Sequence, residues 1–300
     1  MDLPEDSGME LTASQYQVSR PLHATVLLVD LRNFTANLNA SEVDDVGIND
    51  FCHFLSRFYA LCLDCCLVAL PAQSRASPPL SVTSTGDGVL VVLYHDEHAR
   101  YGYLVALLLN AILQVACDHY NRNRRGRERP KTSFGIGVDS GTVSRLKAYP
   151  AGGNGVPLID TFIGECINVA ARAEGASKLY SRSNTIIAAS TNEILCQWLF
   201  GESYATLIQR ALSEEFSDDA HLSVQDRMIE CNRALCLTYM HHHNLSGVNE
   251  PVALFRLAHG SVALGNPRFE SLLGQLASTT RHRDEIDRFI TGATSLLPST

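Results

Sequence analysis

The chain has 300 residues, of which 45% are hydrophobic and 19% are charged, and it carries a formal net charge of −8 at pH 7. This composition is ordinary for a globular protein that is long enough to bury a sizeable core. The net negative charge argues against a general attraction to nucleic acid or to an anionic membrane. We therefore expect neither a nucleic-acid partner nor a membrane partner.

The sequence pattern predicts neither export nor a membrane anchor. The first 19 residues are polar and acidic, and they lack the apolar core of an export signal. The longest apolar run, residues 104–117, contains Asn110 and is too short to span a bilayer. The nine cysteines are odd in number and irregular in spacing, which favours buried reduced thiols over a metal site. These features predict a cytoplasmic protein.

Strand-like and helix-like segments alternate along the chain. Apolar runs bounded by turn residues predict strands at residues 24–31, 80–83, 89–94, 132–138, 142–146, 185–189, 235–240 and 251–257. Apolar residues at helical spacing predict helices at about 41–70, 98–121, 163–179, 191–200 and 266–290. Turn-forming residues predict connections at 72–79, 139–141, 149–157 and 246–247, and a polar, acidic stretch predicts an insertion at 213–227.

The close spacing of the hairpin strands predicts an α+β protein with a mainly antiparallel sheet and flanking helices. We expect three parts: a flexible leader over residues 1–20, a main domain over 21–260 and a helical tail over 261–300. Trp198, the only tryptophan, is expected in the core. Asp139 is expected to bind the amides of its turn, as aspartates do in such loops.

Two aspartates lie beside apolar strands. Asp30 ends the first strand, and Asp87 precedes the third one in the turn Ser84–Gly88. An ionised carboxylate beside an apolar strand is costly to bury unless something compensates its charge. A hard divalent cation fits this role, because Mg²⁺ takes few protein ligands and completes its shell with water or phosphate oxygens. The pair therefore indicates phosphoryl chemistry on a nucleotide.

A second polar pair lies on a helix that otherwise carries small and apolar residues. Asn168 and Arg172 are four residues apart, so they share one helical face. The pair is either an exposed polar stripe or an amide and a guanidinium directed at charge that develops on a phosphate. The residues alone leave both interpretations open.

Five segments together resemble the catalytic domain of the class III nucleotidyl cyclases, the family of adenylate and guanylate cyclases. They are residues 28–35, 85–88, 135–141, 161–172 and 245–252, and the resemblance covers about residues 22–258. Each segment alone is a weak signal, but their order along the chain is specific. The resemblance implies a ferredoxin-like fold and makes residues 21–260 the cyclase catalytic domain.

The resemblance also implies roles for the polar residues. Asp30 and Asp87, with the backbone of Leu31, would hold two Mg²⁺ or Mn²⁺ ions per site. Asn168 would orient the ribose, and Arg172 would stabilise charge on the α-phosphate. In the family the aspartates come from one catalytic domain and the Asn/Arg helix from a second one. This chain carries both halves, so the resemblance implies a head-to-tail homodimer.

The resemblance further places Phe34 and Thr35 among the residues that bind substrate, since backbone amides at a helix start can cradle phosphates. Purine-specific relatives carry a base-contacting lysine where this chain has Thr83, whose uncharged hydroxyl is too short for that contact. The partner position is Thr161. A pyrimidine is smaller than a purine, and Arg57 is a candidate to reach into the space and donate to a uracil carbonyl.

A second family lysine, which binds phosphate, is replaced by Ser246, and Arg145 or Lys147 are candidates to substitute for it. The chain keeps the aspartates and the Asn/Arg pair but lacks the purine-reading lysine. This combination looks like the pyrimidine cyclases of bacterial Pycsar antiphage defence, which would imply conversion of UTP to cyclic UMP and pyrophosphate. A separate effector protein would read the cyclic nucleotide. The alternatives are a cytidylate cyclase that makes cyclic CMP, an adenylate or guanylate cyclase, and an inactive nucleotide-binding module.

Overall fold

The structure is a computed structural model that describes residues 15–41, 45–76, 78–124, 130–149, 156–179, 184–200, 206, 237–257, 267–278 and 283–294. The strands are β1 (Gln15–Val18), β2 (Leu22–Arg32), β3 (Leu80–Ser84), β4 (Gly88–Leu93), β5 (Ser133–Tyr149), β6 (Ile159–Ile163), β7 (Thr185–Ala188), β8 (Leu237–His243) and β9 (Val252–Leu257). The helices are α1 (Phe34–Ser41), α2 (Asp45–Ala69), α3 (His98–Asn123), α4 (Glu165–Ser177), α5 (Ala189–Phe200), α8 (Pro267–Ser278) and α9 (Arg283–Thr294), with a 3₁₀ turn at Ala72–Ser74.

The nine described strands form one sheet with the main order β3-β4-β2-β5-β7-β9-β8. Its ladders are antiparallel except that β5 and β7 run parallel. The prediction of an α+β fold with a mainly antiparallel sheet is confirmed. Strand β2 lies between β4 and β5, and its residue Asp30 pairs with Gly88 on one side and with Gly135 on the other.

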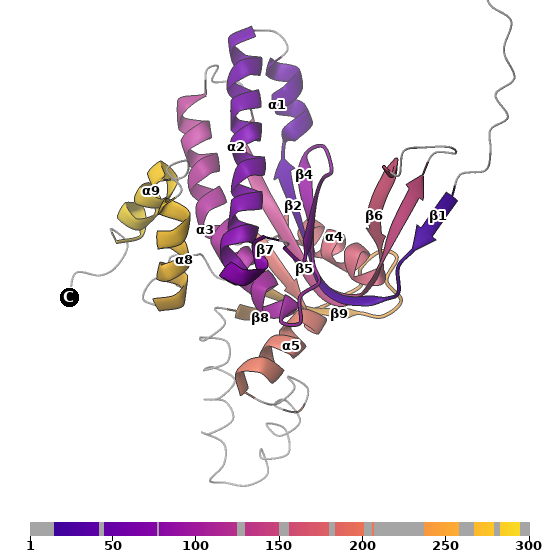
Figure 1. The fold of residues 1–300 in the computed structure, drawn as a ribbon. Helices are drawn as coiled ribbons and strands as arrows, with labels where there is room; N and C mark the ends of the chain where they lie inside the picture. Colours follow the sequence, from indigo (N-terminus) through magenta and orange to yellow (C-terminus); the bar gives the residue numbers. More distant parts are fainter. Residues whose placement is uncertain are drawn as a thin grey trace, which may run out of the picture.

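Helices cover both faces of the sheet, because strand β2 carries apolar side chains on both faces and these must be buried. Leu27 and Val29 of β2 join the large core under α2 and α3, whereas Ala24 and Val26 pack with Cys166 of α4 on the opposite face. Helix α4 lies so close to β5 that a Cβ at position 137 would stand 1.8 Å from the carbonyl oxygen of residue 170, which explains the glycine there. Helices α8 and α9 pack outside α2 and α3 (Figure 1).

Strand β5 is much longer than the main sheet needs. Its outer half pairs with β1 and β6 and forms an arm that extends away from the body of the fold (Figure 1). Large apolar side chains on and beside this arm are exposed, among them Val18, Leu158 at 76% exposure, and Ile163. The arm therefore carries apolar surface that the other described residues leave uncovered.

The predicted turn at residues 139–141 is wrong, because β5 runs through these residues and pairs there with β2. The Asp-Ser-Gly sequence that signalled a turn serves packing instead. A Cβ at Gly141 would lie 3.1 Å from that of Cys166, so the glycine makes room for α4. Asp139 accepts hydrogen bonds from the Ser190 hydroxyl of α5 and from the Ser140 backbone amide, so the expected amide contact is present, within a strand and not in a turn. Burial raises the pKa of Asp139 to about 7.

Several expected boundaries also differ. The helix expected from residue 41 is preceded by α1, which starts after Asn33 at φ 62° and packs Phe34 on Phe51 with ring centroids 5.5 Å apart. The expected tail helix is two helices, α8 and α9. The expected leader contains β1, which pairs with β5. The insertion at 213–227 and most of the 149–157 loop lie outside the described residues.

Trp198 is not a core residue. Its side chain is 43% exposed, and the Arg100 guanidinium lies 4.7 Å above its ring. The cation–π contact gives the indole a partner at the surface. The expectation of buried free thiols holds for six described cysteines, namely Cys62, Cys65, Cys66, Cys117, Cys166 and Cys196, but not for Cys52, which is free and exposed.

Two of the described helices have the length and apolar composition of a membrane span: α2 from Gly47 to Ala69 and the whole of α3. The sequence expectation rested on one uninterrupted apolar run and missed helices whose polar residues are scattered. The apolar window of α3 is 83% buried inside the fold and that of α2 is 50% buried. Such burial is typical of core helices in a packed domain.

Candidate active site

The sheet brings the two predicted metal-binding aspartates to one place. Asp30 lies two residues before the end of the inner strand β2 and opposite Gly88 of β4 in the ladder. The Leu31 amide donates a 2.9 Å hydrogen bond to the Asp87 carbonyl oxygen, which fixes the β3–β4 turn against β2. A Cβ at Gly88 would stand 2.4 Å from the Val29 carbonyl oxygen, so the close approach needs a glycine. Asp30, Leu31 and Asp87 are therefore neighbours.

The region around Asp30, Leu31 and Asp87, called the corner below, has surplus negative charge. Burial, followed by the nearby charges of Glu174 and Asp87, raises the pKa of Asp30 to about 6. Glu174 lies on α4, and its side chain is only 5% exposed. The Lys178 ammonium opposes these charges from 3.7 Å to Asp30 Oδ2 and 3.4 Å to Glu174 Oε2. It lowers the pKa of Asp30 but does not outweigh burial and the two carboxylates.

Arg32 is the other cation at this corner, and it points to the same helix. Its guanidinium donates to the Ser177 hydroxyl of α4 at 2.5 Å. Burial lowers the pKa of Arg32, while the charges of Glu174 and Asp30 raise it. The corner thus contains three carboxylates and two cations, and the Lys178 side chain is half exposed. The carboxylates are those of Asp30, Asp87 and Glu174, and the second cation is Arg32. A further cation would meet favourable charge here.

The donor set fits a hard divalent cation. Carboxylate and backbone carbonyl oxygens are the ligands that Mg²⁺ and Mn²⁺ prefer. Within the described residues no group of three or more His, Cys, Asp or Glu side chains is arranged to hold a metal. The pair Asp30 and Asp87, with the Leu31 backbone, leaves the rest of a metal shell to water or substrate, which is the usual mode for Mg²⁺ with nucleotides.

Asn168 and Arg172 lie elsewhere on α4. Both are exposed, and the Arg172 Nε donates a 3.1 Å hydrogen bond to the Ser246 carbonyl oxygen in the turn between β8 and β9. Arg172 and Glu174 are two residues apart, which is about 200° around a helix. The helix therefore presents Glu174 toward Asp30 and the Asn/Arg pair away from it. One chain does not bring Arg172 to the aspartates.

The remaining predicted substrate residues are distributed over three elements. Phe34 begins α1 with its ring packed on the core, and Thr35 follows it with an exposed side chain. Thr83 is exposed on β3, opposite Leu90 of β4. Thr161 lies on β6 of the arm, half-buried.

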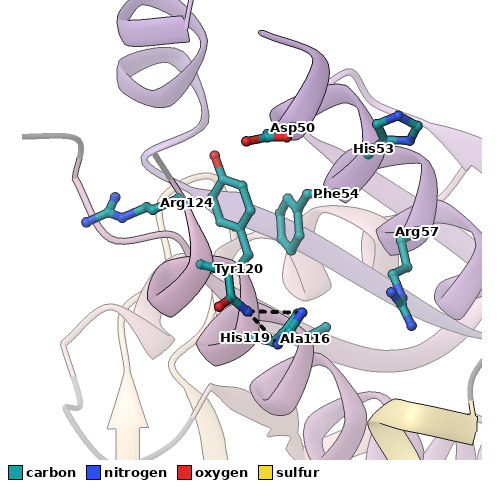
Figure 2. A pocket seen from close by; sticks show the side chains of 9 residues that line it. Asp50, His53, Phe54, Arg57, Ala116, His119, Tyr120 and Arg124 are labelled. Atoms are coloured by element: carbon teal, nitrogen blue, oxygen red, sulfur yellow. Dashed lines mark hydrogen bonds between the residues drawn. The ribbon is translucent and has the colours of Figure 1, made fainter. Parts of the chain in front are cut away.

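Arg57 lines a cavity that is separate from the site of Asp30 and Asp87. Its helix, α2, and helix α3 enclose a cavity of about 240 Å³, which also borders Asp50, His53 and Arg124. The rings of Phe54 and Tyr120 are stacked in this cavity with centroids 4.5 Å apart, and Figure 2 shows Arg57 on the same helix as Phe54. Neither Asp30 nor Asp87 contributes to the lining of this cavity.

The two candidates to replace the phosphate lysine lie on the arm. Arg145 donates two hydrogen bonds to the Asp160 carboxylate, from Nε at 2.6 Å and from Nη2 at 2.7 Å. The hydrogen bonds to Asp160 raise the pKa of Arg145. Lys147 sits opposite Asp160 in the β5–β6 ladder. Arg145 is thus engaged within its own chain.

Besides Arg32, the sequence did not predict three residues at the corner: Glu174, Lys178 and Tyr59. Glu174 and Lys178 are four residues apart, a spacing that signals an ion pair on a helix. Nothing local, however, indicates that this pair faces Asp30. Tyr59 of α2 contacts the turn that carries Asp87, and no sequence signal points to it. All three depend on how helices dock on the sheet.

The fold is that of the class III nucleotidyl cyclase catalytic domain. A bacterial light-regulated adenylyl cyclase matches 86% of this chain at a TM-score of 0.50 and 13% identity; the chain spans 58% of that protein. The adenylyl cyclase CyaB from P. aeruginosa matches with a TM-score of 0.47 and 14% identity, over 81% of this chain and 96% of that one. The guanylyl cyclase Cya2 matches with a TM-score of 0.47 and 16% identity, over 80% and 94%.

Sequence comparison adds nothing to this structural likeness. No protein-family model matches the chain, and no curated protein is significantly similar to it. At 13% identity the structural likeness carries the fold alone.

Proposed function

We propose that this chain is a nucleotidyl cyclase that uses two divalent cations to convert a nucleoside triphosphate into a 3′,5′-cyclic monophosphate and pyrophosphate. The observation that carries the proposal is the adjacency of Asp30 and Asp87 at a corner with surplus negative charge. The cyclase fold gives this adjacency its meaning, because an isolated pair of carboxylates has many uses.

The chemistry is an in-line displacement. The ribose 3′-oxygen forms a bond to the α-phosphorus, the bond from that phosphorus to the bridging oxygen breaks to release pyrophosphate, and the 3′-hydroxyl proton passes to solvent water. When bound, Mg²⁺ or Mn²⁺ would lower the pKa of the 3′-hydroxyl and neutralise charge on the triphosphate. Asp30, Asp87 and the Leu31 backbone would hold the cations. The backbone at Phe34 and Thr35, at the start of α1, binds phosphate oxygens.

Asn168 and Arg172 complete the site from a second copy of the chain. The ribose is oriented by the Asn168 amide, and the Arg172 guanidinium stabilises charge on the α-phosphate. Support comes from the direction of their helical face, which is turned away from the aspartates of the same chain. A head-to-tail homodimer would bring each face to the partner's aspartates and form two equivalent sites. The apolar arm of β1, β5 and β6 offers surface for that contact.

We further propose that the base is a pyrimidine, with UTP as substrate and cyclic UMP as product. Thr83 is exposed on β3 and carries no charge, so it offers no lysine-like donor to a purine edge. A site rejects a base strongly when binding would leave polar groups buried without a hydrogen-bond partner. Arg57 and Thr161 remain candidates to contact the base. The signal would be read by a separate effector protein in antiphage defence within the cytoplasm.

The alternatives are CTP with cyclic CMP as product, ATP or GTP, and an inactive nucleotide-binding module. The deciding experiment is incubation of the purified protein with each of the four ribonucleoside triphosphates and Mn²⁺, with mass detection of cyclic products. Cyclic UMP as the main product is the expected result. Cyclic AMP or cyclic GMP alone would refute the pyrimidine proposal, and binding without any product would refute the cyclase proposal.

A further inference from the structure

The turn that carries Asp87 is fixed by hydrogen bonds within the β3–β4 hairpin. The Thr85 amide donates to the Gly88 carbonyl oxygen at 2.9 Å, and the Gly86 amide donates to the Ser84 hydroxyl oxygen at 3.3 Å. Gly86 has φ +97°, a conformation that other residues adopt only with strain. The turn therefore depends on the positive φ of Gly86, an exposed residue that directly precedes Asp87.

One side chain from outside the hairpin also holds this turn. The Tyr59 hydroxyl donates to the Gly86 carbonyl oxygen at 2.5 Å and accepts from the Ser84 hydroxyl at 3.2 Å. It thus bridges the two residues that flank Thr85, and the carbonyl it binds belongs to the peptide bond that leads into Asp87. A rigid support on that peptide restricts the direction in which the Asp87 carboxylate points.

Tyr59 itself is anchored firmly. Its ring packs against the main core and lies 5.5 Å from the ring of Phe58, which is fully buried. Both belong to α2, a helix of 25 residues that packs along α3. The hydroxyl is therefore presented to the turn by a side chain that packs on the main core, whereas residues 84–86 of the turn are exposed.

We propose that Tyr59 is a positioning residue that holds the Ser84–Gly88 turn so that the Asp87 carboxylate faces Asp30 before a cation arrives. The proposal rests on the metal site of the proposed function and adds to it a residue that does not itself touch the cation. A carboxylate that is already oriented loses less conformational freedom on binding a cation, so the support increases cation affinity.

The test compares Tyr59→Phe with Tyr94→Phe. Both variants keep the ring and lose one hydroxyl that bonds to a backbone carbonyl of the same hairpin; Tyr94 binds the Leu80 oxygen at 3.4 Å, at the end far from Asp87. We expect Tyr59→Phe to weaken Mn²⁺ binding about three- to tenfold, the value of one ordinary hydrogen bond. Tyr94→Phe should leave Mn²⁺ affinity unchanged, as measured by calorimetric titration.

A second measurement separates positioning from general stability. In the absence of metal, amide hydrogen exchange at residues 85–87 should be faster in Tyr59→Phe than in the wild type, while exchange in α2 and β4 stays the same. Equal Mn²⁺ affinity of the two variants, or unchanged exchange in the turn, would overturn the proposal.

The outcome for the metal site is distinguishable from the outcome for Tyr59. If Asp87→Asn abolishes Mn²⁺ binding and Tyr59→Phe does not change it, the metal site stands and the positioning role fails. If wild-type protein binds no Mn²⁺, the metal site of the proposed function fails, and the positioning role fails with it.

Discussion

Replacing Asp30 with asparagine should stabilise the metal-free protein above neutral pH, although it removes a proposed metal ligand. The pKa of Asp30 is raised from 3.8 to about 6 because the carboxylate is buried and lies near Glu174 and Asp87. The ionised form is thus less stable in the folded state than in the unfolded one. A raised carboxyl pKa makes folding most favourable below the unfolded pKa, and that stability is lost as the pH rises through the folded pKa.

The magnitude follows from the size of the shift. A difference of about two pKa units corresponds to about 3 kcal/mol at pH 8, where the carboxylate is fully ionised in both states. The Lys178 contact, which asparagine would weaken, reduces the net gain of Asp30→Asn to about 1–3 kcal/mol. At pH 5 the folded carboxyl is largely protonated, so the gain should fall to about half of its value at pH 8.

The assay is urea unfolding of wild type and Asp30→Asn at pH 8 and pH 5, in buffer with a chelator. Asp96→Asn is the matched control, because Asp96 is exposed before α3 and should change the free energy of unfolding little at either pH. Mn²⁺ should then stabilise wild type but not Asp30→Asn. Equal stability of wild type and Asp30→Asn at pH 8, or a gain that does not depend on pH, would refute the electrostatic reasoning.

Two further substitutions probe the docking of α4 and the charge at the corner. Gly137→Ala on β5 should destabilise the fold by about 3 kcal/mol or more in urea unfolding, because its Cβ would meet the α4 backbone. Gly175→Ala on α4 is the control, since its Cβ would enter open space and the variant should be as stable as the wild type or more stable. Lys178→Ala should tighten Mn²⁺ binding about two- to fivefold, because its ammonium competes for Asp30; weaker binding in a calorimetric titration would show that Lys178 assists the cation instead.

The part of the site that local pattern controls could be predicted from the sequence. The β3–β4 hairpin that carries Asp87 follows from two apolar runs joined by a glycine-containing turn, and the shared face of Asn168 and Arg172 follows from helical spacing. Both features involve residues whose neighbours in the sequence already determine their geometry. The pairing of β2 with β4, which puts Asp30 beside Asp87, joins distant residues and was implied only by the family resemblance.

The rest could not be predicted because it depends on how distant elements dock. The Asp-Ser-Gly signal at Asp139 predicted a turn, yet Gly141 is needed for contact with α4, which follows later in the chain. Glu174 raises the pKa of Asp30 only because Gly135 and Gly137 let α4 lie close on β5. No local sequence pattern reports such a contact.

The measurement that tests the central claim most directly is mixing of two inactive chains. Asp30→Ala removes a cation ligand, and Arg172→Ala removes the guanidinium that a second copy should supply. When the two variants exchange subunits at random, half of the dimers pair unlike chains and each has one intact site, so activity should recover to about a quarter of wild type. Formation of the mixed dimers without any recovery of cyclic nucleotide synthesis would contradict a site shared between two chains.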